Sequence, residues 1–266
     1  MGYGMVFPEI KEIECISSRD GSVEPSLFYH PGGSAPVPLV VGLHTWSYDR
    51  YNQVDGMLPL CRERGWGLLL PEFRGANLVA NPRARQAGGS SLAIQDVIDA
   101  VQLVSDRYPI DRDALFLLGG SGGGHASLLV AANAPTLWRG VSSWVPITDL
   151  AAWHVQNPDY TPHIAACCGG DPGTSVEVDR EYRERSPISH VESLSKVNLS
   201  LHHGRFDQVV SFSHSWNLAL ELERLGSERF FLDIFDGEHD LRYPVAFRWF
   251  ESLLNNDNDL GGRLTG

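Results

Sequence analysis

The sequence has no apolar run long enough to cross a membrane, and it has few basic residues for its size. Its 266 residues include 21 Lys and Arg against 33 Asp and Glu, which gives a formal net charge of −12. A membrane-spanning helix needs about 20 consecutive apolar residues, and both nucleic acid and anionic membranes attract clustered basic side chains. We therefore expect no membrane span, no nucleic-acid partner and a neutral rather than polyanionic substrate.

Cysteine is also scarce, and no C-x-x-C spacing that would predict a zinc site is present. The adjacent Cys167 and Cys168 lie in a Gly-rich segment, where they either pack as thiols or form a disulfide. His202 and His203 fall in a predicted strand and so point to opposite faces, which disfavours a metal site. The first eight residues lack the basic start and apolar core of a signal peptide, which leaves a cytoplasmic and a secreted protein both open.

Short apolar runs alternate with amphipathic segments along the chain. Continuous apolar runs of this length are typical of strands buried on both faces, and the amphipathic segments of helices that cover them. This alternation predicts one α/β domain over residues 1–266, with a mostly parallel sheet and helices on both faces. Strands are expected at 9–17, 22–30, 37–43, 66–70, 114–118, 140–144, 199–202 and 230–234, and helices at 51–64, 122–132, 212–225 and 243–254. Ser90-Ser91 should cap a further helix of about 17 residues.

The longest interruption of this pattern is residues 145–197, which reads as irregular. It lies between two predicted strands whose carboxyl ends face the same edge of the sheet, where ligands bind in open α/β folds. We therefore predict that 145–197 forms a small cap or lid over a site at that edge.

The strongest chemical motif is a serine between glycines. The segment matches G-x-S-x-G and reads Gly119-Gly120-Ser121-Gly122-Gly123. It follows an apolar strand and opens a helix, and a serine at such a tight turn needs small neighbours and lies at a helix N-terminus that favours a developing oxyanion. A phosphate-binding loop would need a lysine, which is absent here. Ser121 is therefore the predicted nucleophile.

A serine nucleophile needs an imidazole base and a carboxylate that orients it. His239 follows the last predicted strand, whereas His125 lies on the same helix as Ser121 and more plausibly packs there. Asp207 is the one carboxylate in the loop after the preceding strand, while Asp96 fits a structural role. The chain order Ser121, Asp207, His239 is that of hydrolases with a nucleophile elbow.

The oxyanion hole needs two backbone N–H groups. Gly122, directly after the serine, should supply one. The loop after the strand at 37–43 should supply the other, and Trp46 is preferred there over Thr45. Because a backbone group donates, the type of side chain is unrestricted.

These motifs together resemble the catalytic domain of the prolyl oligopeptidase family and its esterase relatives, within the α/β-hydrolase superfamily. The matching segments are Gly119–His125, His203–Val210 and Gly237–His239. The resemblance assigns the nucleophile to Ser121, the acid to Asp207 and the base to His239. Where the family often has His-Gly-Gly-Pro, this chain has His44-Thr45-Trp46-Ser47, so Trp46 would crowd the acyl pocket or form one of its walls.

The family's peptidases usually carry an N-terminal β-propeller that restricts access, and about 36 residues before the first core strand are too few for one. We therefore predict a carboxylesterase that forms an acyl-enzyme on a small-molecule ester without a cofactor. Thr45, Trp153 and His154 are candidate pocket residues, with Tyr160 and His163, which suggests an aryl, feruloyl-type or carbohydrate ester. These aromatic residues fit packing of a long loop equally well.

Three other classes use or resemble the same fold. A prolyl-oligopeptidase-like peptidase or amidase uses the same triad and is the alternative. A dehalogenase or dienelactone-type hydrolase would need Asp or Cys at position 121, and a noncatalytic binding module is disfavoured because all three catalytic residues are present. The oligomeric state is left open.

Overall fold

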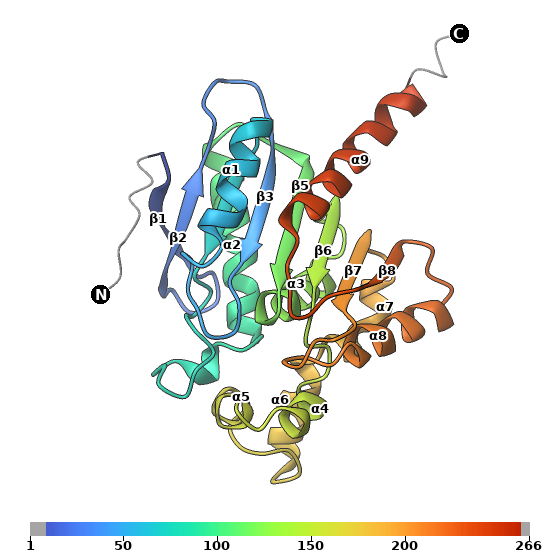
Figure 1. The fold of residues 1–266 in the computed structure, drawn as a ribbon. Helices are drawn as coiled ribbons and strands as arrows, with labels where there is room; N and C mark the ends of the chain where they lie inside the picture. The colour runs from blue at the N-terminus through green and yellow to red at the C-terminus, as the bar shows by residue number, and fades with distance from the viewer. Residues whose placement is uncertain (1–8, 262–266) are drawn as a thin grey trace.

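An eight-stranded sheet forms the centre of the molecule (Figure 1). The computed structural model describes residues 9–261. The strands lie in the order β1-β2-β4-β3-β5-β6-β7-β8; β1 pairs antiparallel with β2, β2 antiparallel with β4, and the remaining neighbours are parallel. The mostly parallel sheet predicted from the apolar runs is confirmed. Its strands are β1 (Lys11–Ile16), β2 (Val23–Tyr29), β3 (Val37–Leu43), β4 (Gly67–Pro71), β5 (Ile110–Gly120), β6 (Gly140–Trp144), β7 (Leu199–Gly204) and β8 (Phe230–Phe235).

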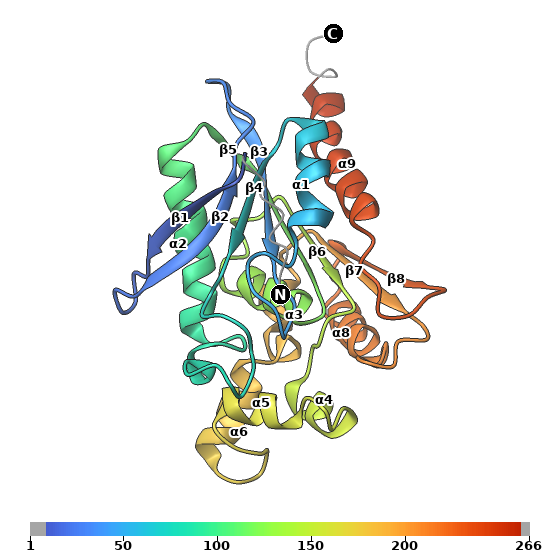
Figure 2. The same cartoon turned by 60° about the vertical axis from the view of Figure 1, so that its left-hand side comes forward.

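Helices cover both faces of the sheet, as Figures 1 and 2 show. One face packs against α1 (Val54–Arg64) and α9 (Tyr243–Gly261). The other packs against α2 (Ser91–Arg107), α3 (Gly122–Asn133), α7 (Val191–Leu194) and α8 (Ser213–Arg224). The predicted start of α2 is confirmed, because the Ser90 side chain accepts a hydrogen bond from the Ala93 N–H as an N-cap.

Residues 145–197 are helical rather than irregular. They contain α4 (Leu150–Gln156), α5 (Thr161–Cys168), α6 (Val176–Glu184) and the 3₁₀ turn η2 (Pro187–His190), followed by α7. In Figure 1, α4, α5 and α6 lie together beyond the carboxyl edge of the sheet. Helices this short, such as the 7-residue α4, show too few turns to produce a readable apolar period. The prediction of an irregular segment was therefore wrong.

A separate apolar cluster joins these helices to the loop after β3. It includes Trp46, Trp153, Cys167 and Cys168, together with Ala84 of the 3₁₀ turn η1 (Ala84–Gln86). Both cysteines are buried free thiols, and burial raises the pKa of Cys167 to about 11 and that of Cys168 to about 12. The two thiols therefore pack against the cluster and are not joined as a disulfide.

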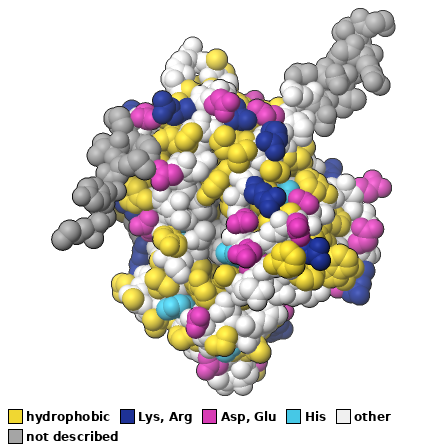
Figure 3. Space-filling view, viewed as in Figure 1, with side chains coloured by type: hydrophobic (Ala, Val, Ile, Leu, Met, Phe, Trp, Pro, Cys, Tyr) yellow, Lys and Arg dark blue, Asp and Glu magenta, His cyan; other side chains and the backbone are white. Residues whose placement is uncertain are grey.

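The surface mixes charged and apolar side chains. On the face shown in Figure 3, Lys and Arg side chains are scattered among acidic and apolar ones and do not gather into one field. Within residues 9–261, none of the helices has the length and apolar character required to cross a membrane.

Candidate active site

Ser121 lies in strained backbone at the sharp turn from β5 into α3. Its φ of 56° and ψ of −122° are unusual for a residue with a side chain. The Ser121 N–H donates to the Trp144 carbonyl at 2.9 Å, which anchors the turn to β6. A Cβ atom on Gly119 would lie 2.1 Å from the Gly123 carbonyl oxygen, so no side chain fits at that flank. Close backbone contacts thus exclude a side chain at Gly119, whereas a Cβ atom on Gly120 would meet only the Leu241 side chain.

Asp207 and His239 meet at the same edge of the sheet. Asp207 lies in the loop after β7 and His239 in the loop after β8, so parallel strands bring both residues together. The His239 Nδ1 atom lies 2.6 Å from Asp207 Oδ2. The other carboxylate oxygen of Asp207 accepts the N–H groups of Val209 at 2.8 Å and Val210 at 2.9 Å. This arrangement fixes the carboxylate and directs the other nitrogen of the His239 ring away from it.

The Asp207 side chain is fully buried, yet it is held as a carboxylate. Burial works to raise its pKa, but hydrogen bonds from His203 and His239, the charge of His239 and the Val210 N–H outweigh burial, so the pKa lies well below its usual value. A carboxylate that stays ionised can orient His239 and stabilise its protonated form.

His203 is a second donor to this carboxylate. Its Nε2 atom lies 3.3 Å from Asp207 Oδ2 and 2.9 Å from the Val210 carbonyl oxygen. Both atoms are acceptors, so the proton resides on Nε2, while Nδ1 accepts the Ser215 hydroxyl at 2.8 Å. The sequence had suggested only that the His203 ring faces away from that of His202.

His202 indeed has different neighbours. Its ring stacks on Trp144, with centroids 3.9 Å apart, and its Nδ1 lies 3.2 Å from Asp233. Across the part of the chain that the structure describes, no cluster of three or more His, Cys, Asp or Glu side chains could hold a metal ion.

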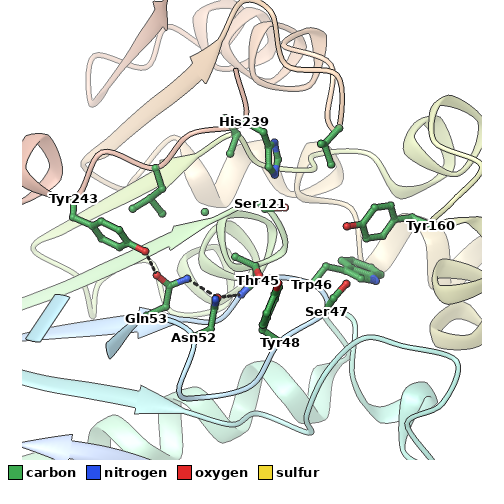
Figure 4. A pocket seen from close by; sticks show the side chains of 14 residues that line it. Thr45, Trp46, Ser47, Tyr48, Asn52, Gln53, Ser121, Tyr160, His239 and Tyr243 are labelled. Carbon is green, nitrogen blue, oxygen red and sulfur yellow. Dashed lines mark hydrogen bonds between the residues drawn. The ribbon is translucent and has the colours of Figure 1, made fainter. Parts of the chain in front are cut away.

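Ser121 and His239 line one pocket of about 240 Å³. Figure 4 shows the His239 ring directed into this pocket near Ser121. No hydrogen bond joins the Ser121 hydroxyl to His239 among the described residues, and such contacts often tighten only when substrate binds. The lining residues are Thr45, Trp46, Ser47, Tyr48, Asn52, Gln53, Gly120, Ser121, Val145, Tyr160, Val209, His239, Leu241 and Tyr243.

Two backbone N–H groups stand side by side next to Ser121. A Cβ atom on Gly122 would lie 2.4 Å from the Trp46 nitrogen, so the two backbones are in direct contact. Neither the Trp46 N–H nor the Gly122 N–H has an acceptor among the described residues, and Gly122 opens a helix, where the first N–H groups lack intrahelical partners. Both N–H groups are therefore without a protein acceptor beside Ser121; Trp46 lines the pocket, whereas Gly122 is not among its lining residues.

Two of the predicted pocket residues lie elsewhere. Trp153 is completely buried behind Trp46, and its indole N–H donates to the Val209 carbonyl. His154 lies within the helical segment, with its Nε2 3.0 Å from Asp171. Thr45 and Tyr160 do line the pocket, whereas His163 does not. The sequence could not predict which side of α4 packs against the cluster around Trp46, because a helix of seven residues shows no clear apolar period.

Several pocket residues were not anticipated, Asn52, Gln53 and Tyr243 among them. Asn52 and Gln53 come just before α1, within what the sequence predicted as helix, and Tyr243 is the first residue of α9. Of these three, only Tyr243 could have been suspected from the sequence, because it follows shortly after the predicted base His239. Among the described residues that line the pocket, none is Asp, Glu, Lys or Arg.

Comparison with known proteins identifies relatives of this chain. It is 26% identical over 250 residues to the acylamino-acid-releasing enzyme 1 of Oryza sativa subsp. japonica, covering 89% of this chain and 32% of the relative. Its fold is similar to the acylaminoacyl peptidase of Pyrococcus horikoshii, with TM-score 0.74, 18% identity, and 91% and 41% of the two chains covered. It is also similar to a puromycin-hydrolyzing peptidase of Mycobacterium tuberculosis, with TM-score 0.72, 22% identity, and 92% and 39% covered. The chain thus spans about a third to two fifths of the length of these proteins.

These comparisons correct the predicted activity. The sequence suggested a carboxylesterase on a small-molecule ester, but the relatives are peptidases. The prediction rested on the expectation that no β-propeller precedes the first core strand, and that argument concerns access to the site. It does not decide which acyl bond the catalytic groups cleave.

The family itself is established by a match that covers well over half of the chain. The pattern of the prolyl oligopeptidase family matches residues 58–253, which run from α1 to α9 and include Ser121, Asp207 and His239. The α/β-hydrolase fold of the structural relatives agrees with the sheet and helices described above. This chain is therefore a serine hydrolase that belongs to the prolyl oligopeptidase family.

Proposed function

We propose that this chain is a serine peptidase, with Ser121 as nucleophile, His239 as general base and Asp207 as the acid that orients it. The observation that carries this proposal is the 2.6 Å contact between His239 Nδ1 and Asp207 Oδ2, which leaves the rest of the His239 ring in the pocket that holds Ser121. The peptidase names of its relatives support amide rather than ester substrates.

The proposed reaction begins when the His239 imidazole takes the proton of the Ser121 hydroxyl as its oxygen attacks the carbonyl carbon of the scissile amide. The resulting oxyanion accepts hydrogen bonds from the backbone N–H groups of Trp46 and Gly122. The His239 imidazolium then gives its proton to the leaving amine, the C–N bond breaks, and an acyl-enzyme remains on Ser121. Water, deprotonated by His239, releases the acid product and restores the serine.

The pocket favours a substrate without a free amine next to the scissile residue. A free α-ammonium group would find no carboxylate on the described lining of this pocket, and a buried charge without a partner is costly. An N-acylated residue or an internal peptide segment meets no such penalty. The helices of 145–197, which place Tyr160 on the pocket wall, would act as a cap over this substrate.

A panel of aminoacyl p-nitroanilides, each with and without an N-acetyl group, tests the proposal. We expect the acetylated compounds to be cleaved with the higher kcat/KM, and Ser121→Ala to lower turnover by several orders of magnitude at unchanged thermal stability. A preference for the free amines would contradict the proposed substrate class. Hydrolysis of p-nitrophenyl esters with no cleavage of any amide would contradict the peptidase itself.

A further inference from the structure

A chain of hydrogen bonds links the last helix to the loop that carries Trp46. The Tyr243 hydroxyl donates to Gln53 Oε1 at 2.5 Å, and Gln53 Nε2 donates to Asn52 Oδ1 at 2.9 Å (Figure 4). Asn52 Oδ1 also accepts the Thr45 N–H at 3.1 Å. Residues 190 positions apart in the sequence are thereby connected to the residue that precedes Trp46.

Tyr243, at one end of this series of hydrogen bonds, is packed firmly. A Cβ atom on Gly56 of α1 would lie 2.4 Å from the Tyr243 ring, so the ring rests directly on the helix backbone. Gln53 is only 2% exposed, and a buried amide that loses a partner carries its full desolvation cost. Tyr243 and Gln53 therefore hold the carboxamide of Asn52 in one orientation.

Thr45 is held on both of its sides. Asn52 accepts its N–H, while its carbonyl oxygen lies 2.9 Å from His44 Nδ1. That carbonyl belongs to the same planar peptide unit as the Trp46 N–H, so fixing Thr45 fixes the direction in which this N–H points. A donor set in advance toward the oxyanion requires no reorganisation during the reaction.

We propose that Asn52, held by Gln53 and Tyr243, is a positioning residue that aims the Trp46 N–H into the oxyanion hole. This inference rests on the proposed function of Ser121 and of that N–H. Asn52 acts through the loop and not by accepting a hydrogen bond from substrate, because two donors already occupy its carbonyl oxygen. Its removal should therefore slow the chemical step and leave substrate affinity almost unchanged.

A double-mutant cycle on Asn52→Leu and Tyr243→Phe tests this proposal. We expect Asn52→Leu to lower kcat about tenfold with KM within about twofold, since one lost hydrogen bond corresponds to about that factor. Tyr243→Phe should lower kcat by about threefold. The double variant should be no slower than Asn52→Leu alone, because Tyr243 acts through Asn52. Tyr51→Phe, which removes a neighbouring hydroxyl that bonds Glu12 outside the pocket, is the control and should change neither constant.

The same cycle should be run on the rate at which a fluorophosphonate probe labels Ser121, with thermal melting to show that each variant is folded. Labelling needs no peptide substrate. A wild-type protein that is labelled but cleaves no amide would refute the proposed peptidase activity, and the labelling rates of the variants would still test the role of Asn52. The proposal is overturned if Asn52→Leu labels within twofold of wild type. It is overturned equally if that variant raises KM alone, or if the two effects simply multiply.

Discussion

The backbones of Gly122 and Trp46 touch: a Cβ atom on Gly122 would lie 2.4 Å from the Trp46 nitrogen and 2.6 Å from its Cα. Gly122 begins α3 directly after β5 and Trp46 lies in the loop after β3, and parallel pairing of these strands brings their ends together. The contact leaves two N–H groups free and adjacent to Ser121. The geometry of the proposed oxyanion hole therefore depends on the absence of a side chain at position 122.

Gly122→Ala should strongly impair catalysis. The added methyl group must push the Trp46 loop away, which removes one donor from the oxyanion, and loss of such a donor typically costs about 10²- to 10³-fold in kcat. The measurement is kcat on the p-nitroanilide substrate, with circular dichroism to confirm the fold. A variant that retains more than about a third of wild-type kcat would show that the two N–H groups do not act together.

Loss of the second donor to Asp207 should change the pH dependence of the reaction. In His203→Leu the Asp207 carboxylate keeps the His239 contact but loses a hydrogen bond, so it holds the protonated form of the His239 ring more tightly. The acid limb of the pH profile of kcat/KM should move to higher pH. His203→Gln, which retains an N–H donor, should move it less. Profiles that coincide with wild type for both variants would contradict this role for His203.

Two buried histidines should make the fold sensitive to acid. Burial lowers the pKa of His125 and of His214 to about 4. In the unfolded chain a histidine titrates near pH 6.5, so between about pH 6.5 and 4 the unfolded state binds protons that the folded state does not. The free energy of unfolding should therefore fall across this range, by about 3 kcal/mol for each histidine at pH 4.

Chemical denaturation at several pH values checks this. His214 is neutral in the fold, with Nδ1 accepting the Thr148 N–H and Nε2 lying 3.0 Å from Gln156 Oε1. His214→Gln removes the titrating ring and should flatten the loss of stability toward pH 4. An identical pH dependence in wild type and variant would show that His214 does not contribute.

The sequence predicts much of the fold because its buried strands are short and continuous. The strand β3 begins and ends where the apolar run does, and the turn at Ser121 is recognisable because tight geometry demands glycine on both sides. The positions of Ser121, Asp207 and His239 follow from the ends of β5, β7 and β8, which come in that order along the chain. Each of these features depends on residues that are close together in the sequence, so a sequence pattern can predict it.

Features that depend on distant contacts could not be predicted. The Asn52 amide is oriented by Gln53, and Gln53 in turn by Tyr243, so their roles appear only once α1 and α9 lie on the same face of the sheet. In the same way, Trp153 is kept out of the pocket by its packing against Trp46. The prediction of an ester substrate was also wrong, because a catalytic triad alone does not reveal which acyl bond it cleaves.

The most direct test of the proposed triad is a comparison of p-nitroanilide hydrolysis by Ser121→Ala, His239→Ala and the double variant. If both residues serve one reaction, each single variant should lose about 10⁴-fold or more in kcat, and the double variant should lose no more than either one. Losses that multiply in the double variant, or a Ser121→Ala enzyme that retains more than about 1% of wild-type activity, would contradict the account.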